Sequence, residues 1–147
     1  GFQLTRAVWP AMKTRGGGTI VNVASVASLQ GEPYVTAYCA AKGAVEALTR
    51  SVAVHCAQSG IPVRCNSLHP GPIRTPMVKQ LGAQLAAAVK AGELTLPPAV
   101  GGAGYSSTPE ETATSVLFLA SDASKWVNGT RLVVDNTASV TRGHVPA

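Results

Sequence analysis

Charged and aromatic residues are scarce in this sequence of 147 residues. Charged residues make up 13% of it and aromatic residues 5%, whereas 46% of the residues are hydrophobic. The net charge is +5, but the basic residues are scattered along the chain and form no cluster. Proteins that bind nucleic acids concentrate basic side chains on one face and often interleave them with aromatic ones. The composition therefore argues against a nucleic-acid partner and is typical of a globular domain with its own core.

Paired cysteines and long apolar runs are absent as well. Cys39, Cys56 and Cys65 form no CxxC pair and are odd in number, so neither a disulfide framework nor a cysteine metal site is indicated. We expect free thiols in a reducing compartment, which favours the cytoplasm. No apolar run is long enough to cross a bilayer, and no signal-peptide pattern is visible. We therefore expect no membrane partner.

A glycine-rich loop that could bind a dinucleotide phosphate is also missing. Such a loop follows a strand and opens a helix. The glycine triplet at 16–18 has the opposite context, because it follows a helical pattern over 1–13 and precedes a strand-like run that starts at Thr19. We therefore predict that these glycines form a flexible turn and bind no phosphate.

What the sequence does contain is an alternation of strand and helix patterns. Nearly continuous apolar runs are typical of parallel strands that are buried on both faces, and apolar residues at helical spacing predict helices. The strand patterns cover 19–24, 62–68 and 131–135, and the helical patterns cover 1–13, 35–59, 75–91 and 109–120. Thr108 is the expected N-cap of the last helix, and a loop is expected over 97–107. This order predicts an α/β fold, the later half of a doubly wound parallel, Rossmann-like sheet, with three strands and flanking helices.

The segment from Ser25 to Lys42 carries the residues best suited to chemistry. Ser25 follows the first strand pattern, and Gly31 and Pro33 mark a turn before the long helical pattern. Tyr38 and Lys42 are four residues apart in that pattern, so their side chains share one face of the helix. Because the turn lets the chain fold back, we predict that Ser25 lies near Tyr38.

These three residue types suit proton transfer at a carbon that bears a hydroxyl or carbonyl oxygen. A tyrosine can act as a base near neutral pH only if its ionised form is stabilised by about 4 kcal/mol. A lysine cation about 4 Å away supplies roughly that amount. A serine hydroxyl both donates and accepts hydrogen bonds, so Ser25 can hold a substrate oxygen while Tyr38 moves its proton.

At these positions the sequence resembles the short-chain dehydrogenase/reductase family. The family motif is a tyrosine, three residues and a lysine, with a serine thirteen positions before the tyrosine, and Tyr38, Lys42 and Ser25 have both spacings. The segments NVAS at 22–25, YCAAKGAV at 38–45 and PG at 70–71 also occur in the family's order. The resemblance covers the family's later part only. It implies that 1–147 is a partial NAD(P)-binding Rossmann-like domain without the amino-terminal units that carry the glycine-rich loop.

The resemblance implies a role for each of these residues. Tyr38 would be the general acid/base, Lys42 would assist it and bind the nicotinamide ribose, and Ser25 would orient the substrate. The cofactor would be NAD or NADP, whose nicotinamide carries the hydride. The residues that would hold the nicotinamide are Pro70, Gly71, Ile73 and Thr75. The residue that selects between NAD and NADP, and the family's catalytic asparagine, lie in the part that the resemblance does not cover.

The histidines allow two interpretations. His69 directly precedes the loop that would hold the nicotinamide, so it can be a strand-end histidine with its hydrogen bonds satisfied or a residue that touches cofactor or substrate. His55 and His144 are expected at the surface.

The segments at 64–77 and 117–137 look most like the 3β/17β-hydroxysteroid and cyclic secondary-alcohol dehydrogenases of the family. The Ala- and Leu-rich segment 77–96 would then be a lid over an apolar alcohol or ketone, although a helix that packs on its own domain would look the same. The implied activity is NAD(P)-dependent interconversion of a secondary alcohol and a ketone by a homo-oligomer, dimer or tetramer. Two alternatives stay open: an inactive fragment that serves only as an oligomerisation or interaction module, and a ketoacyl-type reductase.

Overall fold

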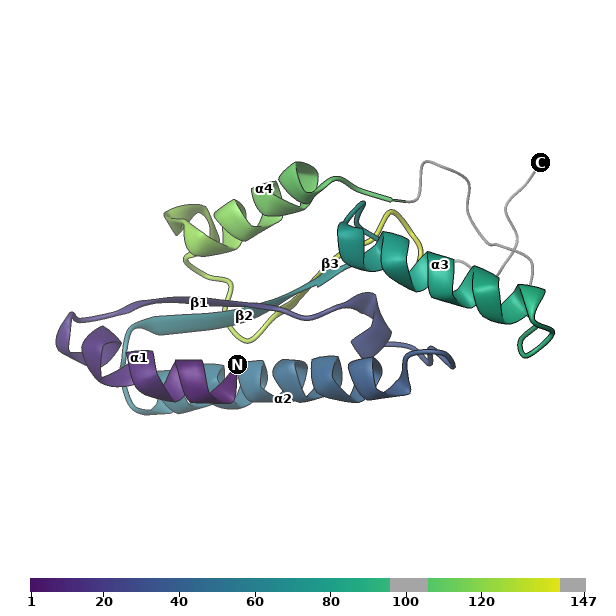
Figure 1. Ribbon diagram of the computed structural model, residues 1–147. Helices are drawn as coiled ribbons and strands as arrows, with labels where there is room; N and C mark the ends of the chain where they lie inside the picture. Colours follow the sequence, from purple (N-terminus) through teal and green to yellow (C-terminus); the bar gives the residue numbers. More distant parts are fainter. Residues whose placement is uncertain (96–105, 141–147) are drawn as a thin grey trace.

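The computed structural model describes residues 1–95 and 106–140 (Figure 1). Its strands form one sheet, and helices lie on both sides of that sheet. The elements in chain order are α1 (Phe2–Thr14), β1 (Gly18–Val23), the short 3-10 helix η1 (Val26–Ser28), α2 (Thr36–Gln58), β2 (Val63–Pro70), α3 (Pro76–Lys90), α4 (Pro109–Ala120), the short 3-10 helix η3 (Asp122–Ser124) and β3 (Arg131–Val134).

The sheet is parallel and has the strand order β1-β2-β3. Gly18 of β1 lies opposite Val63 of β2, and Ser67 of β2 lies opposite Arg131 of β3. Parallel neighbours require a crossover connection; α2 lies in the connection from β1 to β2, and α3 and α4 lie in the connection from β2 to β3. The predicted fold class, an α/β arrangement of three parallel strands with flanking helices, is confirmed.

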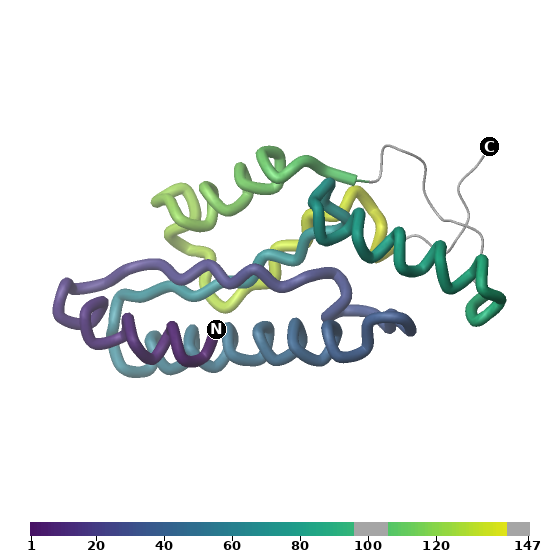
Figure 2. Tube along the Cα trace, viewed as in Figure 1, coloured from purple at the N-terminus to yellow at the C-terminus, as the bar shows by residue number. Residues whose placement is uncertain are grey.

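The helices form two layers around the sheet. Figures 1 and 2 show α1 and α2 on one side and α4 on the other, while α3 extends beyond the end at which the strands finish. α1 contacts α2 through the rings of Trp9 and His55, whose centroids are 5.4 Å apart. His55 is exposed, as predicted. Within 1–95 and 106–140, no helix combines the length and apolar character needed to cross a bilayer.

The element boundaries agree closely with the prediction. β2 runs two residues beyond the predicted end at Leu68, to Pro70. α2 ends at Gln58, and Gly60 follows with φ 65°, the left-handed conformation that glycine adopts readily after a helix. The two 3-10 helices were not predicted, because a single turn is too short to produce a periodic pattern. Most of the predicted loop over 97–107, and His144, lie outside the described residues.

The glycine triplet forms a tight turn between α1 and β1. Gly17 has φ 141°, and a Cβ atom at this position would lie 2.6 Å from the carbonyl oxygen of Pro62. The amide of Gly18 donates to that same oxygen at 3.1 Å. The turn is therefore packed against the segment that leads into β2, and the predicted turn is confirmed.

The start of α4 is fixed by a reciprocal pair of hydrogen bonds. The Thr108 hydroxyl oxygen accepts from the Glu111 amide at 3.1 Å, and the Glu111 carboxylate accepts from the Thr108 amide at 2.7 Å. This capping box satisfies two amides that the helix itself leaves free, and it confirms Thr108 as the N-cap. The hydrogen bond from the Thr108 amide lowers the pKa of Glu111.

The core is centred on β2, which is buried along almost its whole length. Apolar side chains from both layers pack on it, among them Ala53 and Cys56 of α2 and Leu119 of α4. β2 also buries polar side chains, and these find partners: the Asn66 amide nitrogen donates to the Val127 carbonyl at 2.8 Å, and its oxygen accepts from the Thr130 amide at 3.0 Å. Asn66 thus ties the loop before β3 to the central strand.

Arg64 of β2 fixes the carboxyl end of α4. Its guanidinium donates to the carbonyl oxygens of Leu119 at 3.2 Å and Ser121 at 3.1 Å, and to the Ser124 hydroxyl at 3.0 Å. The carbonyls at the end of a helix have no partners within the helix, and a cation there also interacts favourably with the helix dipole. A single side chain therefore holds α4 and η3 against the sheet.

We predict that Arg64→Met lowers the free energy of unfolding of the chain by about 2–3 kcal/mol, because it removes several charge-assisted hydrogen bonds at one site. Urea unfolding followed by circular dichroism measures this change. Arg15→Met is the matched control at the exposed C-cap of α1 and should change stability by no more than about 0.5 kcal/mol. Equal effects of the two substitutions would contradict the role given to Arg64.

Candidate active site

Ser25 lies directly beyond the carboxyl end of β1. The amide of Ala24 continues the pairing with β2 by donating to the Leu68 carbonyl at 2.8 Å, and Ser25 then begins η1 as its N-cap. The Ser25 hydroxyl oxygen accepts a hydrogen bond from the Ala27 amide at 3.2 Å. That bond uses a lone pair and leaves the hydroxyl proton available, so Ser25 can still donate to a ligand oxygen.

Tyr38 and Lys42 lie on the first turns of α2, on one face, as predicted. The Lys42 ammonium is 5.5 Å from the centroid of the Tyr38 ring. The same ammonium donates to the Val23 carbonyl at 2.8 Å, and this bond joins the start of α2 to the end of β1. Of the three N–H donors of a lysine, one is therefore used within the protein.

These elements bring the three predicted catalytic residues to the same end of the sheet. η1 packs against α2, and the Lys42 bond reaches Val23, two residues before Ser25. Figure 1 shows the carboxyl end of β1 beside the start of α2. A further hydrogen bond, from the Tyr34 hydroxyl to the Thr95 carbonyl at 3.3 Å, links the segment before α2 to the segment after α3. The carboxyl ends of parallel strands are where sheets of this type bind ligands.

The segment after β2 contains the four residues predicted to hold a nicotinamide. Pro70 ends β2, the Gly71 amide donates to the Val134 carbonyl at 3.0 Å, and Ile73 forms a parallel bridge with Ser107. A Cβ atom on Gly71 would lie 3.0 Å from the Cα and Cβ atoms of Asp135, so a larger residue here would press on the segment after β3. Thr75 is the N-cap of α3, with its hydroxyl oxygen accepting from the Val78 amide at 3.3 Å.

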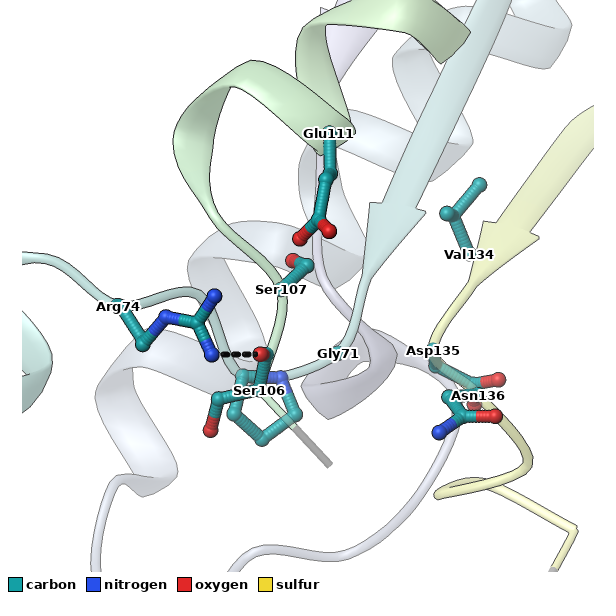
Figure 3. A pocket seen from close by; sticks show the side chains of 9 residues that line it. Gly71, Arg74, Ser106, Ser107, Glu111, Val134, Asp135 and Asn136 are labelled. Carbon is teal, nitrogen blue, oxygen red and sulfur yellow. Dashed lines mark hydrogen bonds between the residues drawn. The ribbon is translucent and has the colours of Figure 1, made fainter. Parts of the chain in front are cut away.

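A cavity of about 530 Å³ lies between the ends of β2 and β3 and the start of α4 (Figure 3). Ser25, Tyr38 and Lys42 do not line it. The Arg74 guanidinium, which does, donates to the Ser106 carbonyl at 2.9 Å, as the dashed line in Figure 3 marks. The cavity is lined by Gly71, Pro72, Arg74, Ser106, Ser107, Glu111, Val134, Asp135 and Asn136.

His69 is fully buried beside Ser25. Its Nδ1 atom lies 3.1 Å from the Ser25 carbonyl oxygen and 2.9 Å from the Ser28 hydroxyl, and its Nε2 atom lies 2.8 Å from the Ser67 hydroxyl. Burial lowers the pKa of His69, so the ring is neutral at physiological pH. Of the two interpretations of His69, the structure agrees with a strand-end histidine whose hydrogen bonds are satisfied. Ser28 and Ser67 could not be identified from the sequence, because Ser28 is 41 residues from its partner His69 and Ser67 lies in the same buried strand as His69.

The residues at this end of the sheet fit the nicotinamide half of a dinucleotide. Among the described residues Lys42 uses one of its three ammonium donors, on the Val23 carbonyl, so two donors can bond ribose hydroxyls. In 1–95 and 106–140, no group of three or more His, Cys, Asp or Glu side chains is arranged to hold a metal ion.

Comparison with characterised proteins identifies relatives over most of the chain. It is 43% identical to 2-(R)-hydroxypropyl-CoM dehydrogenase of Xanthobacter autotrophicus, over 88% of this chain and 49% of that enzyme. It is 44% identical to cyclopentanol dehydrogenase of Comamonas testosteroni, over 91% of this chain and 50% of that enzyme. The 3-beta-hydroxysteroid dehydrogenase of the same species is 42% identical, over 86% of this chain and 48% of that enzyme. The chain thus spans about half the length of the curated relatives it matches.

Solved structures and a family model lead to the same group. A structure assigned as an NAD(P)-dependent gluconate 5-dehydrogenase from Beutenbergia cavernae, with bound NADP, superposes with a TM-score of 0.77 at 37% identity, over 94% of this chain and 52% of that one. A short-chain dehydrogenase from Mycobacterium paratuberculosis bound to NAD superposes with a TM-score of 0.73 at 29% identity, over 93% of this chain and 51% of that one. The family model described as enoyl-(acyl carrier protein) reductase matches residues 1–137. Together with the parallel sheet and the Ser25, Tyr38 and Lys42 spacing, these matches establish that the chain belongs to the short-chain dehydrogenase/reductase family.

Proposed function

We propose that this chain carries the catalytic part of an NAD(P)-dependent dehydrogenase that interconverts a secondary alcohol and a ketone. The observation that carries the proposal is the position of the Lys42 ammonium, which bonds the Val23 carbonyl at the end of β1 and lies 5.5 Å from the Tyr38 ring centroid. This arrangement puts a fixed cation beside a tyrosine at the ligand-binding end of a parallel sheet.

In the proposed reaction, Tyr38 is the general acid/base. During alcohol oxidation its oxygen takes the hydroxyl proton of the substrate, and during ketone reduction it returns that proton to the carbonyl oxygen. The Lys42 cation stabilises the negative charge that Tyr38 carries when it acts as a base. Ser25 donates its free hydroxyl proton to the same substrate oxygen and so holds the reacting carbon in place.

Lys42 and the segment after β2 are the proposed cofactor contacts. NAD or NADP supplies the hydride acceptor and donor. The two remaining Lys42 donors would bind hydroxyls of the nicotinamide ribose, together with Tyr38. Pro70, Gly71 and Ile73 would border the nicotinamide, and Thr75 would contact its carboxamide through its hydroxyl proton or backbone. In this proposal the chain is a partial Rossmann-like domain, 1–147, of a longer enzyme in which a glycine-rich loop elsewhere binds the pyrophosphate.

We infer that the substrate is an apolar secondary alcohol, such as a hydroxysteroid or a cyclic alcohol. The names of two relatives, cyclopentanol dehydrogenase and 3-beta-hydroxysteroid dehydrogenase, support this class. So do the exposed apolar side chains of α3, Met77, Val78 and Val89, which would face a substrate if this helix acts as a lid. The ketoacyl-type reductase is the alternative, and the name of one similar solved structure, a betaketoacyl-ACP reductase with 36% identity and a TM-score of 0.72, supports it.

Exposed apolar side chains and free cysteines bear on the assembly and the location of the protein. α1 exposes Phe2 and Leu4, and the region of α4 and η3 exposes Leu117 and Trp126, the last with 91% of its surface accessible. Contacts with another chain would bury these apolar side chains, so we propose a homo-oligomer. If the isolated chain is inactive, these surfaces favour the second candidate function, an interaction module. The free Cys39, Cys56 and Cys65 support a reducing, cytoplasmic location.

We predict that Tyr38→Phe abolishes turnover but not cofactor binding. The test uses a completed enzyme, in which the amino-terminal half of Comamonas testosteroni cyclopentanol dehydrogenase precedes residues 1–147. Loss of the general acid/base should reduce kcat for cyclopentanol oxidation by at least about a hundredfold. The Kd for NADH, measured by calorimetric titration, should rise by no more than about tenfold, because a single lost hydrogen bond costs about 0.5–1.5 kcal/mol.

Tyr34→Phe is the matched control for that experiment. Tyr34 is an exposed tyrosine four residues earlier, and its hydroxyl contacts only the Thr95 carbonyl among the described residues. This variant should keep kcat within about threefold of the parent. Substantial turnover by Tyr38→Phe, or an equal loss in both variants, would contradict the role of Tyr38.

We also predict that Gly71→Ala weakens NADH binding by at least about tenfold, because the new methyl group meets the backbone of Asp135 and displaces the segment after β2. Calorimetric titration of the completed enzyme with NADH measures the effect. Gly82→Ala is the control, since a Cβ atom there meets nothing within 4 Å. It should leave the Kd unchanged and stabilise α3 by about 0.5–1 kcal/mol. Unaltered NADH affinity in Gly71→Ala would argue against this segment as the nicotinamide site.

A further inference from the structure

His69 connects the end of β2 to the turn that carries Ser25. It has no accessible surface, and its ring lies between two serine hydroxyls, Ser67 on Nε2 at 2.8 Å and Ser28 on Nδ1 at 2.9 Å. Nδ1 also lies 3.1 Å from the carbonyl oxygen of Ser25 itself. His69 has no part in the proposed proton transfer itself.

The hydrogen bonds around His69 determine which ring nitrogen carries the proton. The Ser25 carbonyl oxygen can only accept, so the Nδ1 atom that faces it must donate. The Ser28 hydroxyl donates to the same carbonyl at 2.6 Å, which leaves its oxygen free to accept from Nδ1–H. Nε2 is then an acceptor for the Ser67 hydroxyl. The neutral ring with its proton on Nδ1 therefore satisfies every group in the cluster.

Burial is the largest influence on the His69 ring and lowers its pKa. The hydrogen bond to the Ser25 carbonyl and the charge of Glu46 favour the imidazolium, whereas Arg131 and Arg50 oppose it. Glu46 is itself paired with Arg50 and Arg131. His69 consequently acts as a fixed donor and acceptor.

We propose that His69 is a positioning residue for the reaction: its Nδ1–H holds the turn at 25–28 through the Ser25 carbonyl and the Ser28 hydroxyl, and so sets where the Ser25 hydroxyl meets the substrate. The Ser25 hydroxyl is oriented within this turn by the Ala27 amide. If the turn shifts, the donor to the substrate oxygen shifts with it, whereas the cofactor contacts at Lys42 and 70–75 stay in place. This inference rests on the substrate-orienting role of Ser25 in the proposed function.

The test compares His69→Leu with His69→Asn in the completed enzyme. Leucine fills a similar volume without a donor, whereas the asparagine amide nitrogen can take the place of Nδ1. Displacement of a positioning group by a fraction of an ångström should lower kcat of His69→Leu by about tenfold or more, with the Kd for NADH within about twofold. His69→Asn should recover most of the lost kcat. A Leu variant with unchanged kcat, or an Asn variant as impaired as the Leu variant, overturns the proposal.

Val63→Ala separates positioning from general destabilisation. Val63 is buried in the same strand, at its other end, so this variant weakens packing without touching the turn. Its kcat should stay close to that of the parent at a temperature where both are folded. If it loses as much kcat as His69→Leu, the effect of His69 is merely structural and the proposal fails.

Two further measurements distinguish failure of this inference from failure of the proposed function. Ser25→Ala in the completed enzyme tests the role of Ser25: full activity there overturns this inference, whereas turnover that depends on Tyr38 would still support the proposed function. Nitrogen-15 NMR of the His69 ring in the 147-residue chain, at neutral pH, tests the tautomer without any turnover. A protonated Nδ1 with an unprotonated Nε2 is expected, and the opposite tautomer or a doubly protonated ring overturns the assignment.

Discussion

The hydrogen bonds made by the polar side chains of β2 are the constraint on which the rest of the structure depends. A buried polar group without a partner costs about 1–3 kcal/mol, so each of these side chains requires a particular segment to lie beside it. Asn66 binds the loop before β3, Arg64 binds the end of α4, and His69 binds the turn at 25–28. Hydrophobic burial alone would leave the positions of these segments undetermined, because it has no directional preference.

Strand pairing, the His69 bond and the Lys42 bond together bring the proposed catalytic residues to one end of the sheet. Parallel pairing aligns the carboxyl ends of the strands, and the connections from these ends form the proposed site. The turn held by His69 presents Ser25, and the Lys42 bond to the Val23 carbonyl fixes the start of α2 against the end of β1. Two of the three proposed catalytic residues are thus bonded directly to the sheet: Lys42 through the Val23 carbonyl and Ser25 through its carbonyl and His69.

The sequence was sufficient for those features that leave a regular pattern. Apolar periodicity predicted the strands and long helices, the Thr108 cap was visible from its residue type, and the spacing of Tyr38 and Lys42 predicted their shared face. The cluster around His69 was not predicted, because Ser28 and His69 are 41 residues apart and neither alters any periodic pattern. The cavity between the ends of β2 and β3 was missed for the same reason: its lining residues come from separate segments that meet only in the folded chain.

The Lys42 ammonium bonds the protein on one side and has donors left for a cofactor on the other. This division gives a physical reason why Lys42 suits the proposed role. A lysine that points only at a cofactor would be unpaired whenever the cofactor leaves, and it would then turn toward water at the cost of its position. The Val23 carbonyl accepts a hydrogen bond from the Lys42 ammonium at 2.8 Å. This bond also restricts the directions in which the other two N–H groups of the ammonium can point. In the proposed enzyme, the cation beside Tyr38 is therefore ordered before the cofactor binds, and binding does not have to supply the free energy for that ordering.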